Sequence, residues 1–185
     1  GTYKNSGAAP AGNNQGFVMT NGKYTALNFP GDTVTSTVAT AIDPLGDIVG
    51  NYALKSPEPA GNAHGFLLTF NGAWVPVDYT GDGKNHLMTS PYRILPDGTM
   101  LGCVHDGNPP TVMRGVVISP NGGGLLDYPD DKPYAMYYGA TPNRETMVGT
   151  YTSANATGGF GAGSVAHGYL QRYGKVVPFD VPSQT

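Results

Sequence analysis

Short apolar segments alternate with clusters of Gly, Pro, Asn and Asp along the whole chain, and no segment keeps a helical period for more than one or two turns. The segment 64–81, HGFLLTFNGAWVPVDYTG, is typical of a strand, a tight turn and a second strand. Related segments begin at Gln15, Arg114 and His167. The pattern therefore predicts a chain of short strands built around one repeated hairpin.

The repeat can be aligned on a glycine in each hairpin, and the four glycines are spaced by 49, 50 and 53 residues: Gly16, Gly65, Gly115 and Gly168. A second motif precedes each of them, written GTY, GNY, GCV and GTY. A turn centred on Pro44, Pro96 or Pro142 precedes the later three copies of that motif. One complete unit therefore contains four strands, which in the second unit are expected near 35–43, 47–54, 65–70 and 73–79.

The hairpin turns give the register of the last two strands in each unit. Asn-Gly at 21–22 and at 71–72, and Tyr-Gly at 173–174, predict two-residue turns. Counting outward from these turns places the residue before each anchor glycine opposite an Asn or Asp on the next strand. The second unit has one extra residue between these two positions, which predicts a bulge or a slipped turn there.

Four antiparallel strands repeated every ~50 residues are the signature of a β-propeller with one blade per unit. We expect an all-β, propeller-like array of about four four-stranded units in a single domain over residues 1–185. The units are approximately 1–31, 32–81, 82–130 and 131–185, and the first lacks one strand, which gives fifteen strands in all. An array that does not close would leave an unpaired strand edge, which favours association.

The motifs AHGFLLTFNGAWVPVDYTG and AIDPLGDIVGNY also resemble the extracellular HAF repeat, a bacterial and archaeal family. The resemblance covers nearly the whole chain and is weakest in the third unit, where RGVV replaces HGF and GCVH replaces GNYA. It implies a propeller-like repeat located outside the cytoplasm, and it supplies no catalytic residues that could be transferred.

Composition narrows the function classes. Only 12% of the residues are charged and the net charge is −3, so no basic face predicts binding to nucleic acid. No apolar run reaches the ~20 residues of a membrane helix, and we expect no membrane insertion. Cys103 is the single cysteine, so no intrachain disulfide can form. The low charge and the many polar residues favour an extracellular or cell-surface location, and the opening GTYKNSG suggests a mature form or a fragment.

The recurring His, Arg and Gln are expected to be structural. Each is paired by the register with an Asn or Asp, and the members change together, which a cross-strand polar pair explains without chemistry. The expected pairs are Gln15–Asn28, His64–Asp78, Arg114–Asp127 and His167–Asp180.

Function is therefore expected where the units differ, in the loops that gather on one face of the array. Aromatic residues near these loops suit stacking on a sugar ring or contact with a partner protein. The candidate ligand-binding residues are Tyr92, Arg93, Tyr134, Tyr137 and Tyr138.

Two further clusters carry candidate chemistry. Asp78, Thr80 and Asp82 in DYTGDGKNH resemble the start of a calcium loop, although Thr89 stands where the closing Glu is required. His86, His105 and Asp106 have the side chains of a metal site or an acid–base pair. No cofactor is expected, and calcium is a possible ion.

The favoured function is a binding or scaffold module that recognises a glycan or a protein through its variable loop face. One alternative is a structural subunit that assembles into a ring or fibre through an open strand edge. A second alternative is a secreted hydrolase or lyase that uses the loop-face polar residues. The fold hosts all three, so it cannot choose between them.

Overall fold

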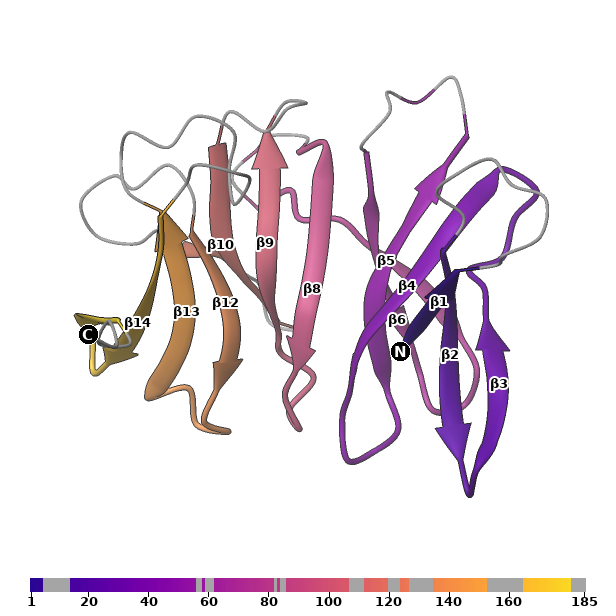
Figure 1. The fold of residues 1–185 in the computed structure, drawn as a ribbon, viewed down its shortest axis with the longest axis horizontal. Coiled ribbons are helices and arrows are strands. Elements are labelled where there is room, and N and C mark those ends of the chain that lie inside the picture. The colour runs from indigo at the N-terminus through magenta and orange to yellow at the C-terminus, as the bar shows by residue number, and fades with distance from the viewer. Residues whose placement is uncertain are drawn as a thin grey trace, which may run out of the picture.

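The computed structural model describes residues 1–4, 14–55, 58, 62–81, 83, 86–106, 112–119, 124–126, 135–152 and 165–180. Within these residues the chain forms fifteen strands and no helix, arranged in four antiparallel sheets (Figure 1). Sheets 2 to 4 have four strands and sheet 1 has three, so the predicted all-β, propeller-like array is confirmed.

The strands follow the chain without a crossover. Sheet 1 contains β1 (Thr2–Lys4), β2 (Asn14–Thr20) and β3 (Lys23–Leu27). Sheet 2 contains β4 (Val34–Ile42), β5 (Ile48–Leu54), β6 (His64–Leu68) and β7 (Trp74–Val77). Sheet 3 contains β8 (Met88–Ile94), β9 (Met100–Asp106), β10 (Val112–Ile118) and β11 (Gly124–Leu126). Sheet 4 contains β12 (Ala135–Ala140), β13 (Thr146–Thr152), β14 (Ala166–Arg172) and β15 (Lys175–Phe179).

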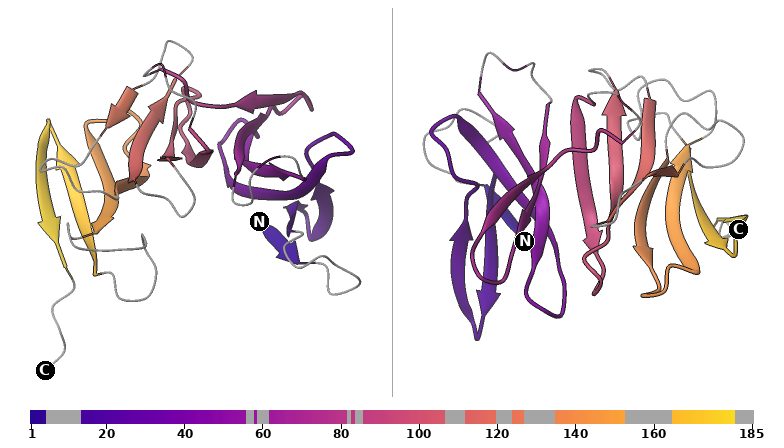
Figure 2. Two further views of the ribbon diagram at one scale, coloured as in Figure 1. Left: turned by 90° about the horizontal axis from the view of Figure 1, so that it is seen from above. Right: turned by 180° about the vertical axis from the view of Figure 1, so that it is seen from behind.

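The four sheets follow one another along an arc, with sheet 1 and sheet 4 at its two ends (Figure 2). Contacts in the described part of the chain join consecutive sheets: β2 lies against β4, β5 against β8, and β10 against β12. In sheet 1 the strand β1 is an edge strand and is the repeat equivalent of β5, β9 and β13, so the described part of this sheet has no counterpart of β4, β8 and β12. Among the described residues, both ends of the arc therefore have one sheet face that no neighbouring sheet covers.

The hairpin turns explain the register. Asn21 has φ 50° and Gly22 has φ 77°, as the two-residue turn predicts. The same prediction for 71–72 is wrong, because Thr69 and Ala73 pair through their backbones and Gly72, with φ 90°, closes a three-residue loop. The extra residue of the second unit therefore lies in its turn. The pairing of β6 with β7 has no bulge, so side chains of both strands point to the same sides of the sheet as in the other units.

Each complete sheet has a bulge at the same place in its first strand, where the pairing skips Thr40, Tyr92 or Tyr138. The residue opposite is always the glycine of the GNY-type motif. A Cβ on Gly50 would lie 1.9 Å from the carbonyl oxygen of Val38, and the equivalent contacts at Gly102 and Gly149 are 2.0 and 2.2 Å. These glycines recur because the bulged backbone leaves no room for a side chain.

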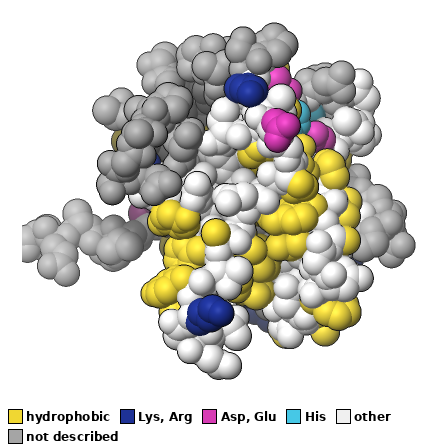
Figure 3. All heavy atoms as spheres, turned by 90° about the vertical axis from the view of Figure 1, so that its right-hand side faces the viewer, with side chains coloured by type: hydrophobic (Ala, Val, Ile, Leu, Met, Phe, Trp, Pro, Cys, Tyr) yellow, Lys and Arg dark blue, Asp and Glu magenta, His cyan; other side chains and the backbone are white. Residues whose placement is uncertain are grey.

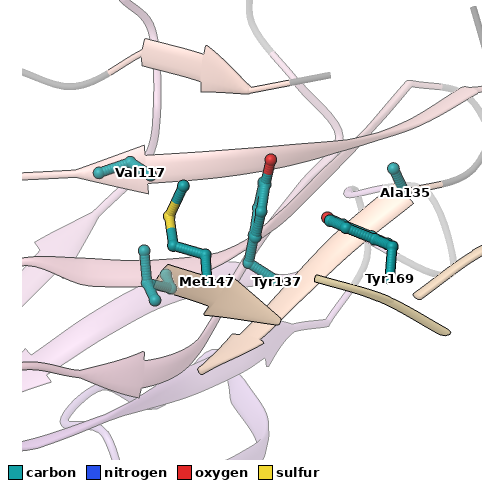
Figure 4. Close-up of a cluster of buried hydrophobic side chains, with 6 residues drawn as sticks. Val117, Ala135, Tyr137, Met147 and Tyr169 are labelled. Atoms are coloured by element: carbon teal, nitrogen blue, oxygen red, sulfur yellow. The ribbon is translucent and has the colours of Figure 1, made fainter. Parts of the chain in front are cut away.

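Hydrophobic cores lie between successive sheets. Between sheets 3 and 4, the buried cluster combines residues of both sheets (Figure 4): Leu101, Val117, Ala135, Tyr137, Met147 and Tyr169. Apolar area removed from water stabilises a fold by about 25 cal/mol per Å². The stability of each sheet therefore depends on burial of its apolar side chains against the neighbouring sheet.

Candidate functional site

The contact between sheets 1 and 2 is an aromatic cluster. Phe29, just after β3, stacks on Tyr52 with ring centroids 3.7 Å apart and interplanar angle 3°. The same ring meets Trp74 edge-on at 5.4 Å and Phe66 at 6.2 Å. Phe66 is completely buried. Phe29 therefore fits among three aromatic side chains that sheet 2 presents from β5, β6 and β7.

Later sheets repeat this arrangement at the equivalent positions. Tyr79, two residues after β7, is buried against Val104 and Val116 of sheet 3. Tyr169 of sheet 4 is fully buried against Leu101 and Val117 of sheet 3. Each inner sheet thus has one face that packs on the preceding sheet, which we call its receiving face, and an opposite face that packs on the next sheet.

Sheet 1 carries the same receiving face, and no sheet of the described chain lies over it. By register, Tyr3, Phe17, Met19 and Tyr24 project from one side of sheet 1, and we call these four residues the sheet 1 face. Phe17 meets Tyr24 edge-on at 5.3 Å and Tyr3 at 6.3 Å. Tyr24 is 66% exposed and Met19 55%, and hydrophobic side chains gather on this side of the molecule (Figure 3).

The aromatic residues of the sheet 1 face are exposed where their equivalents in sheet 2 are covered. Phe17, Tyr3 and Tyr24 are the repeat equivalents of Phe66, Tyr52 and Trp74, which pack around Phe29. Tyr52 is 7% exposed, whereas Tyr3 is 39% exposed. Monomeric proteins seldom leave a large contiguous apolar patch in water, so the sheet 1 face is a candidate interaction surface.

A pocket of about 310 Å³ adjoins the sheet 1 face. Phe17 and Met19 line it on one side, and residues 39–42 and Ile48 of sheet 2 line it on the other. Its wall is mainly apolar, so it suits an apolar side chain of a partner.

The predicted His–Asp contacts are present in two units. His64 Nδ1 donates to Asp78 Oδ2 at 2.9 Å, and His167 Nδ1 donates to Asp180 Oδ2 at 2.8 Å. Each imidazole stacks on a tyrosine of the neighbouring strand, Tyr52 or Tyr151, with centroids 5.2 and 5.1 Å apart. The other Asp78 oxygen accepts from the backbone N–H of Gly65 at 3.3 Å. The carboxylate therefore ties the end of one strand to the next.

His64 has a second carboxylate partner, Glu58, whose Oε1 lies 3.0 Å from Nε2. Partial burial lowers the pKa of His64, but the hydrogen bonds and charges of Asp78 and Glu58 outweigh it, so the pKa is raised above its ordinary value. With both nitrogens facing carboxylates, the imidazolium is an ion-pair partner rather than a general base.

The remaining predicted pairs differ. Gln15 accepts a hydrogen bond from the Tyr3 hydroxyl, so its partner lies on β1. Gln15 and Asn28 both line a polar pocket of about 210 Å³. Arg114 lies on β10 opposite Val104, and Asp127 is outside the described residues.

The predicted ligand-binding tyrosines separate into two groups. Tyr92 and Tyr138, at the bulges of sheets 3 and 4, have ring centroids 5.7 Å apart, and Tyr138 is 47% exposed. Arg93 follows Tyr92 in the chain and is exposed. Tyr137 cannot contact a surface ligand, because it is buried in the core and donates from its hydroxyl to Gln171 Oε1 at 2.7 Å. Tyr134 lies outside the described residues.

His105 is directed toward Cys103, with Nε2 3.3 Å from Sγ, an arrangement that superficially resembles a nucleophile and its base. Cys103 is completely buried, and burial raises the pKa of its thiol to about 12. A nucleophilic cysteine requires an accessible thiol with a lowered pKa. The pair is therefore part of the core beside Met113 and Met136.

The predicted metal sites gain no geometric support. His86 lies against the Tyr79 ring at 5.9 Å, whereas the His105 ring faces Cys103. Asp78 is engaged by His64, and the Asp106 side chain and Asp82 are outside the described residues. Thr80 accepts from Gly83 in a tight turn. Among the residues with described side chains, no three His, Cys, Asp or Glu are grouped to hold a metal ion.

Sequence reasoning missed the residues that join the sheets. Phe29 and Tyr79 each follow the Asn or Asp that ends a hairpin, in the segments NFPG and DYTG. The segments DYPD and DVPS repeat the pattern at Tyr128 and Val181, which lie outside the described residues. A large apolar residue at this fixed position was the available signal.

The comparisons with known proteins leave these surfaces to be judged by their geometry. Scans of protein-family models, curated proteins and solved structures found no match for the chain. The HAF-repeat resemblance therefore stays a prediction. In the part of the chain that the structure describes, no helix has the length and apolarity that a membrane span requires.

Proposed function

We propose that the protein is a structural scaffold subunit that associates with other copies of itself through the sheet 1 face. The observation that carries this proposal is the equivalence of Tyr3, Phe17 and Tyr24 with residues that sheet 2 buries under its neighbour. The sequence suggested assembly through an open strand edge. The sheet 1 face would add side-chain packing to such an association.

If the sheet 1 face is buried on association, a charged side chain placed on it should weaken association. Within the repeat, the equivalent side chains pack against an apolar residue of the adjoining sheet, as Phe66 packs near Phe29. A charged ammonium placed there would lose its hydration without gaining a partner, at a cost of several kcal/mol. Since 1.4 kcal/mol is tenfold in an equilibrium constant, one lysine on this face should weaken association at least tenfold.

The test is sedimentation equilibrium of the wild-type chain and of Tyr24→Lys over a range of concentrations. We expect the wild type to associate beyond its 19.3 kDa chain mass and the variant to stay at that mass. Phe70→Lys is the matched control, because Phe70 is 75% exposed in the turn between β6 and β7 and lies outside the sheet 1 face. A wild type that stays monomeric, or equal association of all three proteins, would refute the proposal.

A second candidate function rests on a different observation, the pair of neighbouring rings of Tyr92 and Tyr138. Aromatic faces on rigid strands stack on sugar rings, so we propose carbohydrate as the ligand of this pair. Titration with a panel of soluble polysaccharides should show binding that Tyr138→Ala removes and Tyr173→Ala preserves. Tyr173 is the matched control, 68% exposed in the turn between β14 and β15. Equal binding by both variants would remove this candidate.

A further inference from the structure

The last sheet of the arc also has an uncovered face. By register, Val148, Leu170 and Val177 form a row across β13, β14 and β15, and Phe179 lies two residues beyond Val177 on the same side. We call these four residues the sheet 4 face. Val148 is 38% exposed, Val177 56% and Phe179 52%.

In the inner sheets the equivalent row is covered by the next sheet. Val49 of sheet 2 is completely buried against Ile94 and Met100 of sheet 3. Leu101 of sheet 3 is completely buried against Tyr137 and Tyr169 of sheet 4. Val148 occupies the same position in sheet 4. It is exposed where Val49 and Leu101 are buried, because no described sheet packs on this side of sheet 4.

The two exposed faces are thus the two different halves of one contact. The sheet 1 face matches the side on which sheets 2 to 4 receive the preceding sheet, and the sheet 4 face matches the side that sheets 1 to 3 turn toward the next one. Within the described chain the halves lie at opposite ends of the arc (Figure 2). A second copy of the chain carries both halves and can supply the one that each end face of the first copy matches.

We infer that the sheet 4 face of one copy packs on the sheet 1 face of a second copy, head to tail. This inference rests on the proposed self-association and names the surface that the sheet 1 face receives. The occupant is a second copy because the covering sheet is already seen three times within the chain, between sheets 1 and 2, 2 and 3, and 3 and 4. The four residues that define each face are uncharged, and by register the cations Arg172 and Lys175 lie on the same side of sheet 4 at its turn end.

A head-to-tail contact differs from a symmetric one in a way that can be measured. Each copy has one face of each kind, so the contact either closes a ring or continues as a filament. A face-to-face dimer would instead bury two sheet 1 faces and leave both sheet 4 faces in water.

The test is complementation between two variants, each with one face blocked. Tyr24→Lys blocks the sheet 1 face and Val177→Lys blocks the sheet 4 face. Both positions are more than half exposed, so the fold should survive, and the single tryptophan, Trp74, reports on it by fluorescence. Each variant alone should remain monomeric under conditions in which the wild type associates.

An equimolar mixture of the two variants should form a discrete 1:1 particle of twice the chain mass. The intact sheet 4 face of Tyr24→Lys then meets the intact sheet 1 face of Val177→Lys, and the blocked faces cap both ends. Native mass spectrometry with one variant isotope-labelled identifies the mixed pair, and Phe70→Lys mixed with Val177→Lys tests whether an unrelated lysine interferes with pairing.

The outcomes separate this inference from the proposed function. A wild type that associates, together with a mixture that stays monomeric, would overturn head-to-tail packing and leave self-association standing. Association of Val177→Lys alone at wild-type strength would likewise overturn it, in favour of contact between two sheet 1 faces. A monomeric wild type would overturn both.

Discussion

Replacing equivalent phenylalanines in a covered and an uncovered sheet should have very different effects on stability. Phe66 is completely buried, with the Trp74 ring 5.0 Å away and the Phe29 ring 6.2 Å away. Truncation of a buried Phe to Ala typically costs about 3–5 kcal/mol, from lost burial and from the cavity left behind. Phe17 has the same place in the repeat but only half of the surroundings, so Phe17→Ala should cost about 1 kcal/mol in the monomer, as partly exposed sites do.

Urea unfolding followed by Trp74 fluorescence measures this difference, because the single tryptophan lies in the covered cluster. The measurement is made at a concentration at which the chain is monomeric. Domains of this kind have a free energy of unfolding of about 5–15 kcal/mol, so Phe66→Ala should lower the urea midpoint strongly.

If Phe66→Ala fails to fold, Phe66→Leu and Phe17→Leu serve as the pair, and the cost at Phe66 should again exceed the cost at Phe17 because only the buried site is left with a cavity. A cost for Phe66→Ala equal to that for Phe17→Ala would refute the reasoning, because the two sites would then have equivalent surroundings.

Further predictions concern the bulge, the histidine and the thiol. Gly50→Ala should destabilise the fold by at least about 2 kcal/mol because its Cβ would meet a carbonyl oxygen at 1.9 Å, whereas Gly139→Ala, whose nearest contact is 3.5 Å, should be nearly neutral in thermal unfolding. The pKa of His64 is raised, so its contribution to stability should be full below pH about 6.5 and should fall as the pH rises through the raised value. Asp78→Asn should weaken that pH dependence in urea titrations, and an unchanged profile would contradict the ion pair. Because burial raises the pKa of Cys103 to about 12, the thiol should resist iodoacetamide at pH 8 in the folded protein and react on unfolding; rapid labelling of the folded chain would contradict this assignment.

The repeat, the strand order and the hairpin register could be predicted from sequence because they depend on local chemistry. Turn residues fix where each strand reverses, and a register counted from the turn places His167 opposite Asp180. The position of the extra residue in the second unit could not be predicted. Asn-Gly at 21–22 and at 71–72 reads alike, yet only the first forms a two-residue turn.

The buried or exposed state of the tyrosines depended on longer-range structure. Alternation predicts that one of Tyr137 and Tyr138 faces the core but does not say which, because the bulge at Tyr138 shifts the alternation of β12. The difference between Phe17 and Phe66 is also invisible locally, since both occur as Gly-Phe in a strand. Only the order of the sheets decides which of them has a neighbour.

The most direct measurement of the account is a cross-link between the two end faces of different molecules. Tyr24→Cys and Val177→Cys are prepared separately, mixed, and treated with a short bismaleimide, while the native Cys103 is buried. Head-to-tail packing predicts a covalent product that contains one copy of each variant and is absent when Phe70→Cys replaces Tyr24→Cys. A product made only of two Tyr24→Cys copies, or no product at concentrations where the wild type associates, would contradict it.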